Sequence, residues 1–139
     1  MYRLVVALFL LTVATVSATA QNLPVPSYWL NQRGSEMKLY NIDAQGKFLG
    51  VFINHAAGSS CQNTPYDQNI PYDLEGRAWR DRVGFAVVWN NWVKDCKSTT
   101  VWHGRVSGHT IWTWWVLYVP RGNNMIPVFR GSDVFQLQP

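Results

Sequence analysis

The sequence has none of the short motifs that mark common hydrolase and nucleotide-binding sites. It contains no Gly-x-Ser-x-Gly, no helical pair of histidines and no glycine-rich loop that would cradle a phosphate. Its Lys and Arg residues are scattered, with no basic stripe of the kind that nucleic-acid binding requires. We therefore expect no nucleic-acid partner, no metal and no cofactor. A small secreted hydrolase using His103, His109 and Lys97 is the enzyme alternative.

Long hydrophobic runs are confined to the N-terminus. Residues 4–16 are apolar after the positive start at Arg3, and Ala18-Thr-Ala20 has the small-x-small pattern of a signal-peptidase site. The run is too short to span a bilayer. We predict that residues 1–20 are a signal peptide and that residues 21–139 form one secreted or periplasmic domain that does not enter a membrane. The alternative is an uncleaved anchor.

Cysteine is scarce, since only Cys61 and Cys96 are present. An even pair in a secreted chain predicts one disulfide, because that compartment is oxidising. The alternative is two buried free thiols. A zinc site is poorly supported, because two cysteines without paired histidines do not supply four tetrahedral ligands.

Helical periodicity is also missing, and turn residues divide the chain into eight short β-type runs. The predicted strands cover residues 28–31, 35–42, 47–54, 72–82, 84–92, 98–106, 109–119 and 126–137. The pattern predicts an all-β fold, an eight-stranded antiparallel up-and-down β-barrel whose interior holds one small ligand. A two-sheet sandwich fits the periodicity nearly as well.

Tryptophan, by contrast, is abundant, and six of the eight lie between residues 83 and 119. Because side chains alternate along a strand, Trp89, Trp102 and Trp115 can point the same way from three neighbouring strands. We expect them to form an aromatic box for a small, flat, mostly apolar ligand, although an inward tryptophan taken alone is core by default. The polar residues expected beside the box are Ser98, Thr100 and Thr113.

The seventh predicted strand is apolar on both faces. One face carries Ile111, Thr113, Trp115, Leu117 and Val119, and the other carries Trp112, Trp114, Val116 and Tyr118. An antiparallel strand with one solvated face is normally polar on that side. We therefore predict self-association through its outer face. The alternative is that the N-terminal segment or a loop covers this face.

Several motifs, in order along the mature chain, resemble the avidin and streptavidin family. They are Trp29-x-Asn31-x-x-Gly34-Ser35-x-Met37, Gly50-x-Phe52, WNNWVKDCKSTTVWHG from Trp89 to Gly104, Thr113-x-Trp115-x-Leu117 and Gly131-x-Asp133-x-Phe135. The region around Cys61 and Cys96 is most similar to the short dimeric, rhizavidin-like bacterial avidins. The resemblance implies an eight-stranded barrel that binds biotin tightly without altering it.

The resemblance also assigns ligand contacts. Asn31 and Ser35 would donate to the ureido oxygen, while Asp133 and Asn54 would accept from the ureido N–H groups. Thr100 would face the thioether sulfur. The walls implied by the resemblance are Phe52, Trp89, Trp102, Trp115 and Leu117, and the groups implied near the carboxylate are Ser98, Ala57, Gly58, Ser59 and Ser60.

Three departures from the family pattern bear on binding. Phe52 stands where the family usually has a tyrosine that donates to the ureido oxygen, a hydrogen bond worth about 1–3 kcal/mol. Arg33 replaces a leucine near the pocket, and the sequence leaves open whether it turns outward or narrows the entrance. Residues 124–127 lack the tryptophan that tetrameric members lend to a neighbour's pocket.

The missing tryptophan favours a homodimer, with a tetramer as the alternative. Each pocket would then be closed by its own loop, held by a Cys61–Cys96 bridge. The alternative ligand is a sugar or an apolar metabolite, because tryptophan faces also stack on such molecules.

Overall fold

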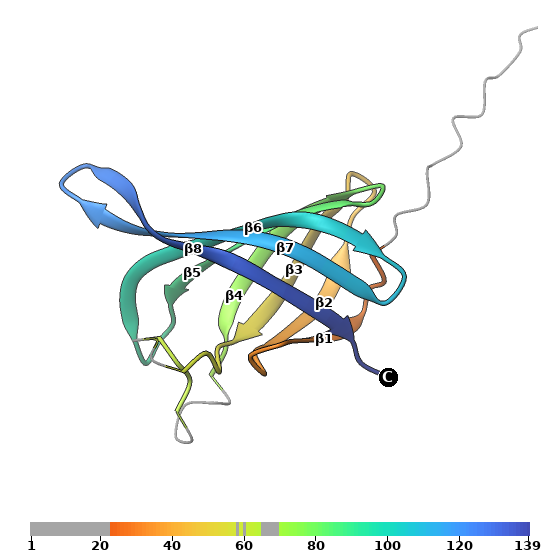
Figure 1. Cartoon of the computed structure of the whole chain (residues 1–139), viewed down its shortest axis with the longest axis horizontal. Coiled ribbons are helices and arrows are strands. Elements are labelled where there is room, and N and C mark those ends of the chain that lie inside the picture. Colours follow the sequence, from red (N-terminus) through yellow and green to blue (C-terminus); the bar gives the residue numbers. More distant parts are fainter. Residues whose placement is uncertain (1–22, 58, 60, 65–69) are drawn as a thin grey trace, which may run out of the picture.

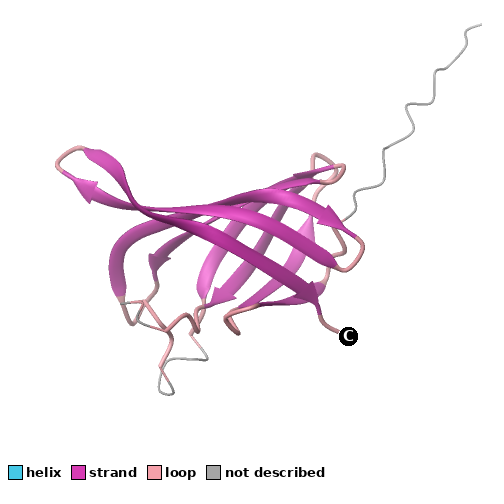
Figure 2. Cartoon of the chain, in the orientation of Figure 1, coloured by secondary structure: helices cyan, strands magenta, loops and turns pink. Residues whose placement is uncertain are grey.

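The computed structural model describes residues 23–57, 59, 61–64 and 70–139, and in this part of the chain eight antiparallel strands close into a barrel (Figures 1 and 2). The strands are β1 (Ser27–Asn31), β2 (Glu36–Ile42), β3 (Lys47–Ile53), β4 (Tyr72–Trp79), β5 (Arg82–Asn90), β6 (Asp95–Ser107), β7 (Thr110–Arg121) and β8 (Asn124–Leu137). The predicted all-β barrel is confirmed. The described residues form no helix that could cross a membrane.

The first and last strands pair with each other and close the barrel. Leu30 of β1 lies opposite Gln136 of β8, and the Gln138 N–H donates a 2.8 Å hydrogen bond to the Tyr28 carbonyl. A sandwich would leave sheet edges at these strands, whereas closure gives each strand a partner on both sides. The C-terminus therefore lies beside the start of β1.

Most strand boundaries differ from those predicted by one to three residues, and three of the differences have a clear local cause. β4 ends at Trp79, because Arg80 has a left-handed backbone (φ 56°) and starts a turn. β5 ends at Asn90, and the Asn91 side-chain oxygen accepts hydrogen bonds from two backbone N–H groups of the following turn. β8 begins at residue 124, two residues early, because Gly122 allows a tight hairpin turn with φ 60°.

Apolar side chains fill one end of the barrel. This filled end is the end at which β1 starts and β8 stops. Its buried side chains include Trp29, Leu39, Phe48, Ala78, Val83, Phe85, Val106, Ile111 and Phe135. Phe48 packs over Gly76, where a Cβ atom would lie only 2.3 Å from the ring, so the ring is seated directly on the backbone of β4. The alternation predicted for Phe85, Val87 and Trp89 is confirmed, since all three are buried.

The outer face of β7 is uncovered by the described chain. Trp112 is 46% exposed and Trp114 is 63% exposed, whereas Ile111 and Thr113 between and beside them are buried. The long β7–β8 hairpin projects beyond the barrel wall (Figure 1). No described loop folds over the two indoles.

Candidate functional site

The end of the barrel opposite the filled end contains a cavity of about 500 Å³. This cavity end is bounded by the β1–β2, β3–β4 and β5–β6 connections and by the base of the β7–β8 hairpin. The lining residues are Asn31, Arg33, Ser35, Phe52, Asn54, Ala56, Ala57, Ser59, Cys61, Trp89, Ser98, Thr100, Trp102, Trp115, Leu117, Phe129 and Asp133. Its size is in the range typical of small-molecule sites.

The structure brings the eleven residues assigned to ligand contact in the sequence around this one cavity. They are Asn31, Ser35, Phe52, Asn54, Trp89, Ser98, Thr100, Trp102, Trp115, Leu117 and Asp133. From the loop, Ala57 and Ser59 also line it, whereas Gly58 and Ser60 lie outside the described residues. The expectation for Thr113 was wrong. Its hydroxyl donates to the Asp133 carbonyl at 3.0 Å, and it does not line the cavity.

The aromatic wall is fixed by ring-to-ring packing. Trp102 stacks on Phe85 with centroids 5.1 Å apart and an interplanar angle of 12°, and Phe52 lies 5.3 Å from it. Trp89 meets Tyr72 edge-on at 5.0 Å and Trp102 at 6.2 Å. Such pairs stabilise rings beyond simple area burial. The indoles are thus held in place by the core beneath them before any ligand arrives.

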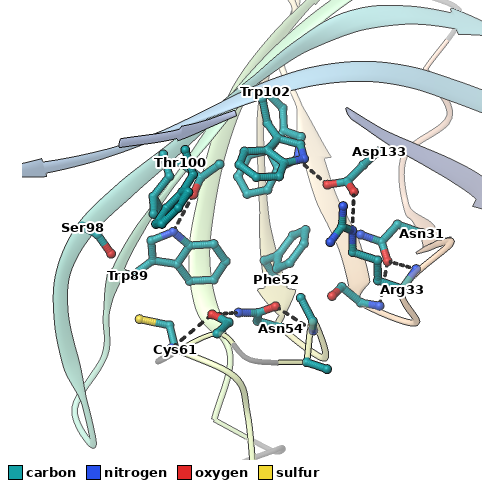
Figure 3. A pocket seen from close by; sticks show the side chains of 17 residues that line it. Asn31, Arg33, Phe52, Asn54, Cys61, Trp89, Ser98, Thr100, Trp102 and Asp133 are labelled. Carbon is teal, nitrogen blue, oxygen red and sulfur yellow. Dashed lines mark hydrogen bonds and ion pairs between the residues drawn. The ribbon is translucent and has the colours of Figure 1, made fainter. Parts of the chain in front are cut away.

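Two indole N–H groups are used to orient polar side chains at the cavity wall. Trp89 Nε1 donates to Thr100 Oγ1 at 2.7 Å, and Trp102 Nε1 donates to Asp133 Oδ2 at 2.9 Å (Figure 3). With its oxygen accepting from Trp89, the Thr100 hydroxyl keeps a proton to donate. Trp115 Nε1 is buried without a hydrogen-bond partner among the described residues, so this indole orients no polar side chain and contributes its ring to the cavity wall.

The β1–β2 turn positions two hydrogen-bond donors at the cavity. Asn31 Oδ1 accepts the backbone N–H groups of Arg33 and Ser35, both at 2.9 Å, and Gly34 takes the left-handed conformation that the turn requires (φ 79°). Because the Asn31 oxygen is used in this way, its NH₂ end is the group left for a ligand. Ser35 Oγ accepts the His55 N–H at 2.9 Å and therefore also keeps its proton available.

The β3–β4 loop is tied to the cavity wall by hydrogen bonds and a disulfide. Asn54 Oδ1 accepts the Ala56 N–H at 3.0 Å, and Asn54 Nδ2 donates to Ser59 Oγ at 3.1 Å. Cys61 is bonded to Cys96 of β6 with Cα atoms 6.0 Å apart, so the predicted disulfide is present. These contacts hold the described part of the loop against the mouth.

A hydrogen bond between His55 and Glu36, outside the cavity, holds the start of the same loop. His55 Nε2 lies 3.2 Å from Glu36 Oε1, and Lys38 Nζ lies 3.3 Å from Glu36 Oε2. Burial alone would raise the pKa of Glu36, but hydrogen bonds with His55, Tyr28 and Lys38 outweigh it and lower the pKa below its usual value. His55 follows Asn54 directly, so this pair anchors the backbone that carries a cavity side chain.

Sequence reasoning missed three contributors to the site. Phe129 lines the mouth opposite Leu117. Residues 129, 131 and 133 share one face of β8, so strand alternation could have placed Phe129 on the same side as Asp133. Ala56 lines the cavity, and Gln32 donates to Asp133 Oδ1 at 3.1 Å, but no sequence pattern indicated either. The open question about Arg33 is answered, since it lines the cavity with Nε 3.4 Å from Asp133 Oδ1.

The cavity has the chemistry of a binding site. Neutral donors and acceptors stand beside indole faces, and the described residues contain no cluster of three side chains that could hold a metal ion. His103, His109 and Lys97 are exposed and lie away from the cavity lining, so the hydrolase alternative lacks a shared site. Buried polar groups cost free energy unless they are hydrogen-bonded, so this lining favours a ligand with matching polar atoms.

Comparisons with known proteins agree with this arrangement. Residues 19–137 match the model of the family described as the avidin family. The chain is 36% identical over 150 residues to afifavidin from Afifella pfennigii, covering 96% of this chain and 89% of afifavidin. Two solved structures are each 34% identical to this chain. The match to a rhizavidin–biotin complex has a TM-score of 0.70 and covers 84% of this chain and 93% of the rhizavidin chain. The match to apo shwanavidin has a TM-score of 0.71 and covers 86% of this chain and 100% of the shwanavidin chain.

Proposed function

This chain belongs to the avidin family, and on that premise we propose that it is a non-catalytic biotin-binding protein that buries the vitamin in its barrel. The observation that carries the proposal is the meeting of three indoles with buried Asn31 and Asp133 around one cavity. A rigid, preformed cavity loses little ordering entropy on binding, which is the route by which small ligands reach high affinity.

We assign the polar end of the cavity to the ureido ring. The Asn31 NH₂ and the Ser35 hydroxyl are the donors suited to the ureido oxygen. Asp133 and the second lone pair of Asn54 Oδ1 are the acceptors suited to the two ring N–H groups. A hydrogen bond to the Asp133 carboxylate is charge-assisted, so it is the strongest single polar contact in this assignment.

The aromatic and loop residues are assigned to the rest of the ligand. Trp89, Trp102 and Trp115 supply the walls, and the Thr100 hydroxyl faces the sulfur. The valerate carboxylate would lie near the mouth, where neutral donors suffice because a charged group there keeps some water. The donors and loop groups assigned to it are Ser98, Ala57 and Ser59.

Isothermal titration calorimetry of the purified protein with biotin tests this function. We expect saturable binding with one site per chain and a melting temperature that rises with biotin concentration by mass action. Glucose or another monosaccharide should give neither effect. A response to the sugar with no response to biotin would favour the alternative ligand class and contradict our proposal.

We further propose that two copies associate through the outer face of β7. The support is the exposed pair Trp112 and Trp114, because patches of this kind usually mark protein interfaces. Light scattering should give a dimer mass for the wild type and a monomer mass for Trp114→Lys. Trp92→Lys is the matched control, since Trp92 is 80% exposed in the β5–β6 turn. A tetramer mass, or a dimer that survives Trp114→Lys, would contradict this proposal.

Secretion is also a proposal and rests on the sequence of residues 1–20. Expression of the full chain in a bacterium with an export pathway should yield a periplasmic or external product. Mass spectrometry should find its N-terminus at Gln21. An intact chain that begins at Met1 would contradict the assignment.

A further inference from the structure

Arg33 and Asp133 are the only charged side chains among the described residues that line the cavity. We propose that Arg33 occupies, in the unliganded protein, the hydrogen-bonding position at Asp133 that a ring N–H of biotin takes, so that the incoming ligand must displace it. Arg33 is therefore a built-in competitor that sets the rate of ligand entry. This inference rests on the proposed function and assigns to one residue of the same site control over the rate of ligand entry.

The backbone of Arg33 is fixed at the mouth while its side chain is not. Its N–H donates to Asn31 Oδ1 at 2.9 Å, and the next residue, Gly34, donates to the Asn31 carbonyl at 3.0 Å. The Arg33 side chain is 51% exposed, compared with 6% for Asp133. Figure 3 shows the side chain reaching from the β1–β2 turn toward the carboxylate. The backbone of the turn is held by hydrogen bonds, and the guanidinium at the end of the side chain is half exposed to solvent.

The other partners of Asp133 cannot leave so easily. Trp102 Nε1 donates to Oδ2 at 2.9 Å from an indole that is 3% exposed. Gln32 Nε2 donates to Oδ1 at 3.1 Å, and its Oε1 accepts the Val134 N–H at 2.8 Å, which locks it to β8. Arg33 Nε, at 3.4 Å from Oδ1, makes the longest of the three contacts. It is the partner that an arriving ligand can replace.

A guanidinium and a cyclic urea present the same feature to a carboxylate, a planar group with N–H donors in the plane. Each carboxylate oxygen accepts about two hydrogen bonds. Oδ1 accepts one from Gln32, and the Arg33 guanidinium lies against the same oxygen as an ion pair. A ring N–H that reaches Oδ1 therefore competes with Arg33. Because Arg33 is half exposed and its contact is long, the competition is weak, and we expect a several-fold effect on rate.

Stopped-flow measurement of biotin binding through tryptophan fluorescence tests the inference. Arg33→Leu and Arg33→Ala should both associate with biotin about two- to fivefold faster than the wild type, with dissociation rates unchanged within about twofold. Arg77→Leu is the charge-matched control, since Arg77 is exposed on β4 and does not line the cavity. It should associate no faster than the wild type.

Unless both Arg33 variants associate faster than the Arg77 control, the inference is wrong. Faster dissociation without faster association would show that Arg33 helps to retain the ligand instead. Two variants of different size guard against a folding defect in one of them. If neither the wild type nor the variants bind biotin, the proposed function and this inference are both wrong. If all of them bind biotin but the Arg33 variants associate no faster, only this inference is wrong.

Discussion

The two ends of the barrel are built from the same strands but from different side chains. At the filled end, the inward positions of β3, β5 and β7 are Phe48, Phe85 and Ile111, which are all apolar and buried. At the cavity end, buried polar groups such as Asp133 and Thr100 alternate with indoles. One period-two pattern therefore produces a packed core at one end and a binding site at the other.

The difference teaches where stability and affinity reside. Burying apolar side chains releases about 25 cal/mol per Å². The filled end consists mainly of such side chains, and the buried Trp29 indole N–H is satisfied within the protein by Ser27 Oγ at 2.8 Å. A buried polar group is costly unless it is satisfied, so the cavity end gains most when a ligand completes its hydrogen bonds. Substitutions at the filled end should therefore change folding, and substitutions at the cavity end should change binding.

The largest expected effect comes from removing a buried aromatic side chain at the filled end, which tests whether the two ends are independent. Phe48→Ala should lower the free energy of unfolding by about 3–5 kcal/mol, because it leaves a void over Gly76. Biotin affinity of the folded fraction should change less than about threefold. Chemical denaturation and calorimetry check both. Leu49→Ala, the next residue and 46% exposed, is the control and should cost under about 1 kcal/mol. A large loss of affinity in Phe48→Ala would show that the two ends are not separable.

The converse substitution removes the charge at the cavity end. Asp133→Ala should weaken biotin binding roughly ten- to a hundredfold, since it deletes a charge-assisted hydrogen bond to the ligand. Stability of the unliganded protein should fall less than in Phe48→Ala. Asp73→Ala, an exposed aspartate on β4, serves as the control in the same titration. Equal affinities in the two variants would contradict the assignment of Asp133 to the ligand.

A smaller effect on biotin affinity is expected from adding a hydrogen-bond donor at position 52. Phe52→Tyr places a hydroxyl on a ring that already lines the cavity between Trp89 and Trp102. We expect about a tenfold gain in biotin affinity from one added hydrogen bond. Phe48→Tyr is the matched control and should give no gain, because that ring is buried and does not line the cavity. If the Phe48→Tyr variant also bound biotin more tightly, the distinction between the two ends would be wrong.

The smallest expected effect is on stability at acid pH and involves Glu36 at the rim of the cavity end. The pKa of Glu36 is lowered in the folded state, so its carboxylate stabilises the fold above the usual glutamate pKa. That contribution is lost as the pH falls through the lowered value. Glu36→Gln should therefore lose less stability than the wild type between about pH 5 and pH 3. Because the group is partly exposed and screened, the difference should be about half a kcal/mol or less.

Thermal melts across that pH range measure this difference. Glu75→Gln, at an exposed glutamate paired with Lys47, is the control. A wild type and a Glu36→Gln variant with parallel pH profiles would contradict the role given to the His55–Glu36 pair.

Much of this arrangement was predictable because strand alternation is a strict rule. It placed Trp89, Trp102 and Trp115 on one wall, and the structure puts them around one cavity. Strand ends were less predictable, since they depend on local hydrogen bonds. Trp92 was expected in the fifth strand, but the Asn91 side chain ends that strand first and leaves Trp92 exposed.

The direction of Arg33 was not predictable, because it depends on where a turn brings a flexible side chain relative to β8. The sequence placed Arg33 near the pocket and offered two directions for it. Only the pairing of β1 with β8, which brings Asp133 beside the β1–β2 turn, selects between them. Gln32 escaped notice for the same reason, since its partners lie about a hundred residues away.

The hydrogen bond from Gln138 to Tyr28 places the last residues of the chain at the filled end, away from the mouth. A tag, a fused enzyme or a linker to a sensor surface added after Pro139 would therefore leave the opening facing solution. Fusions made there should keep the access that the unmodified protein gives to biotinylated cargo.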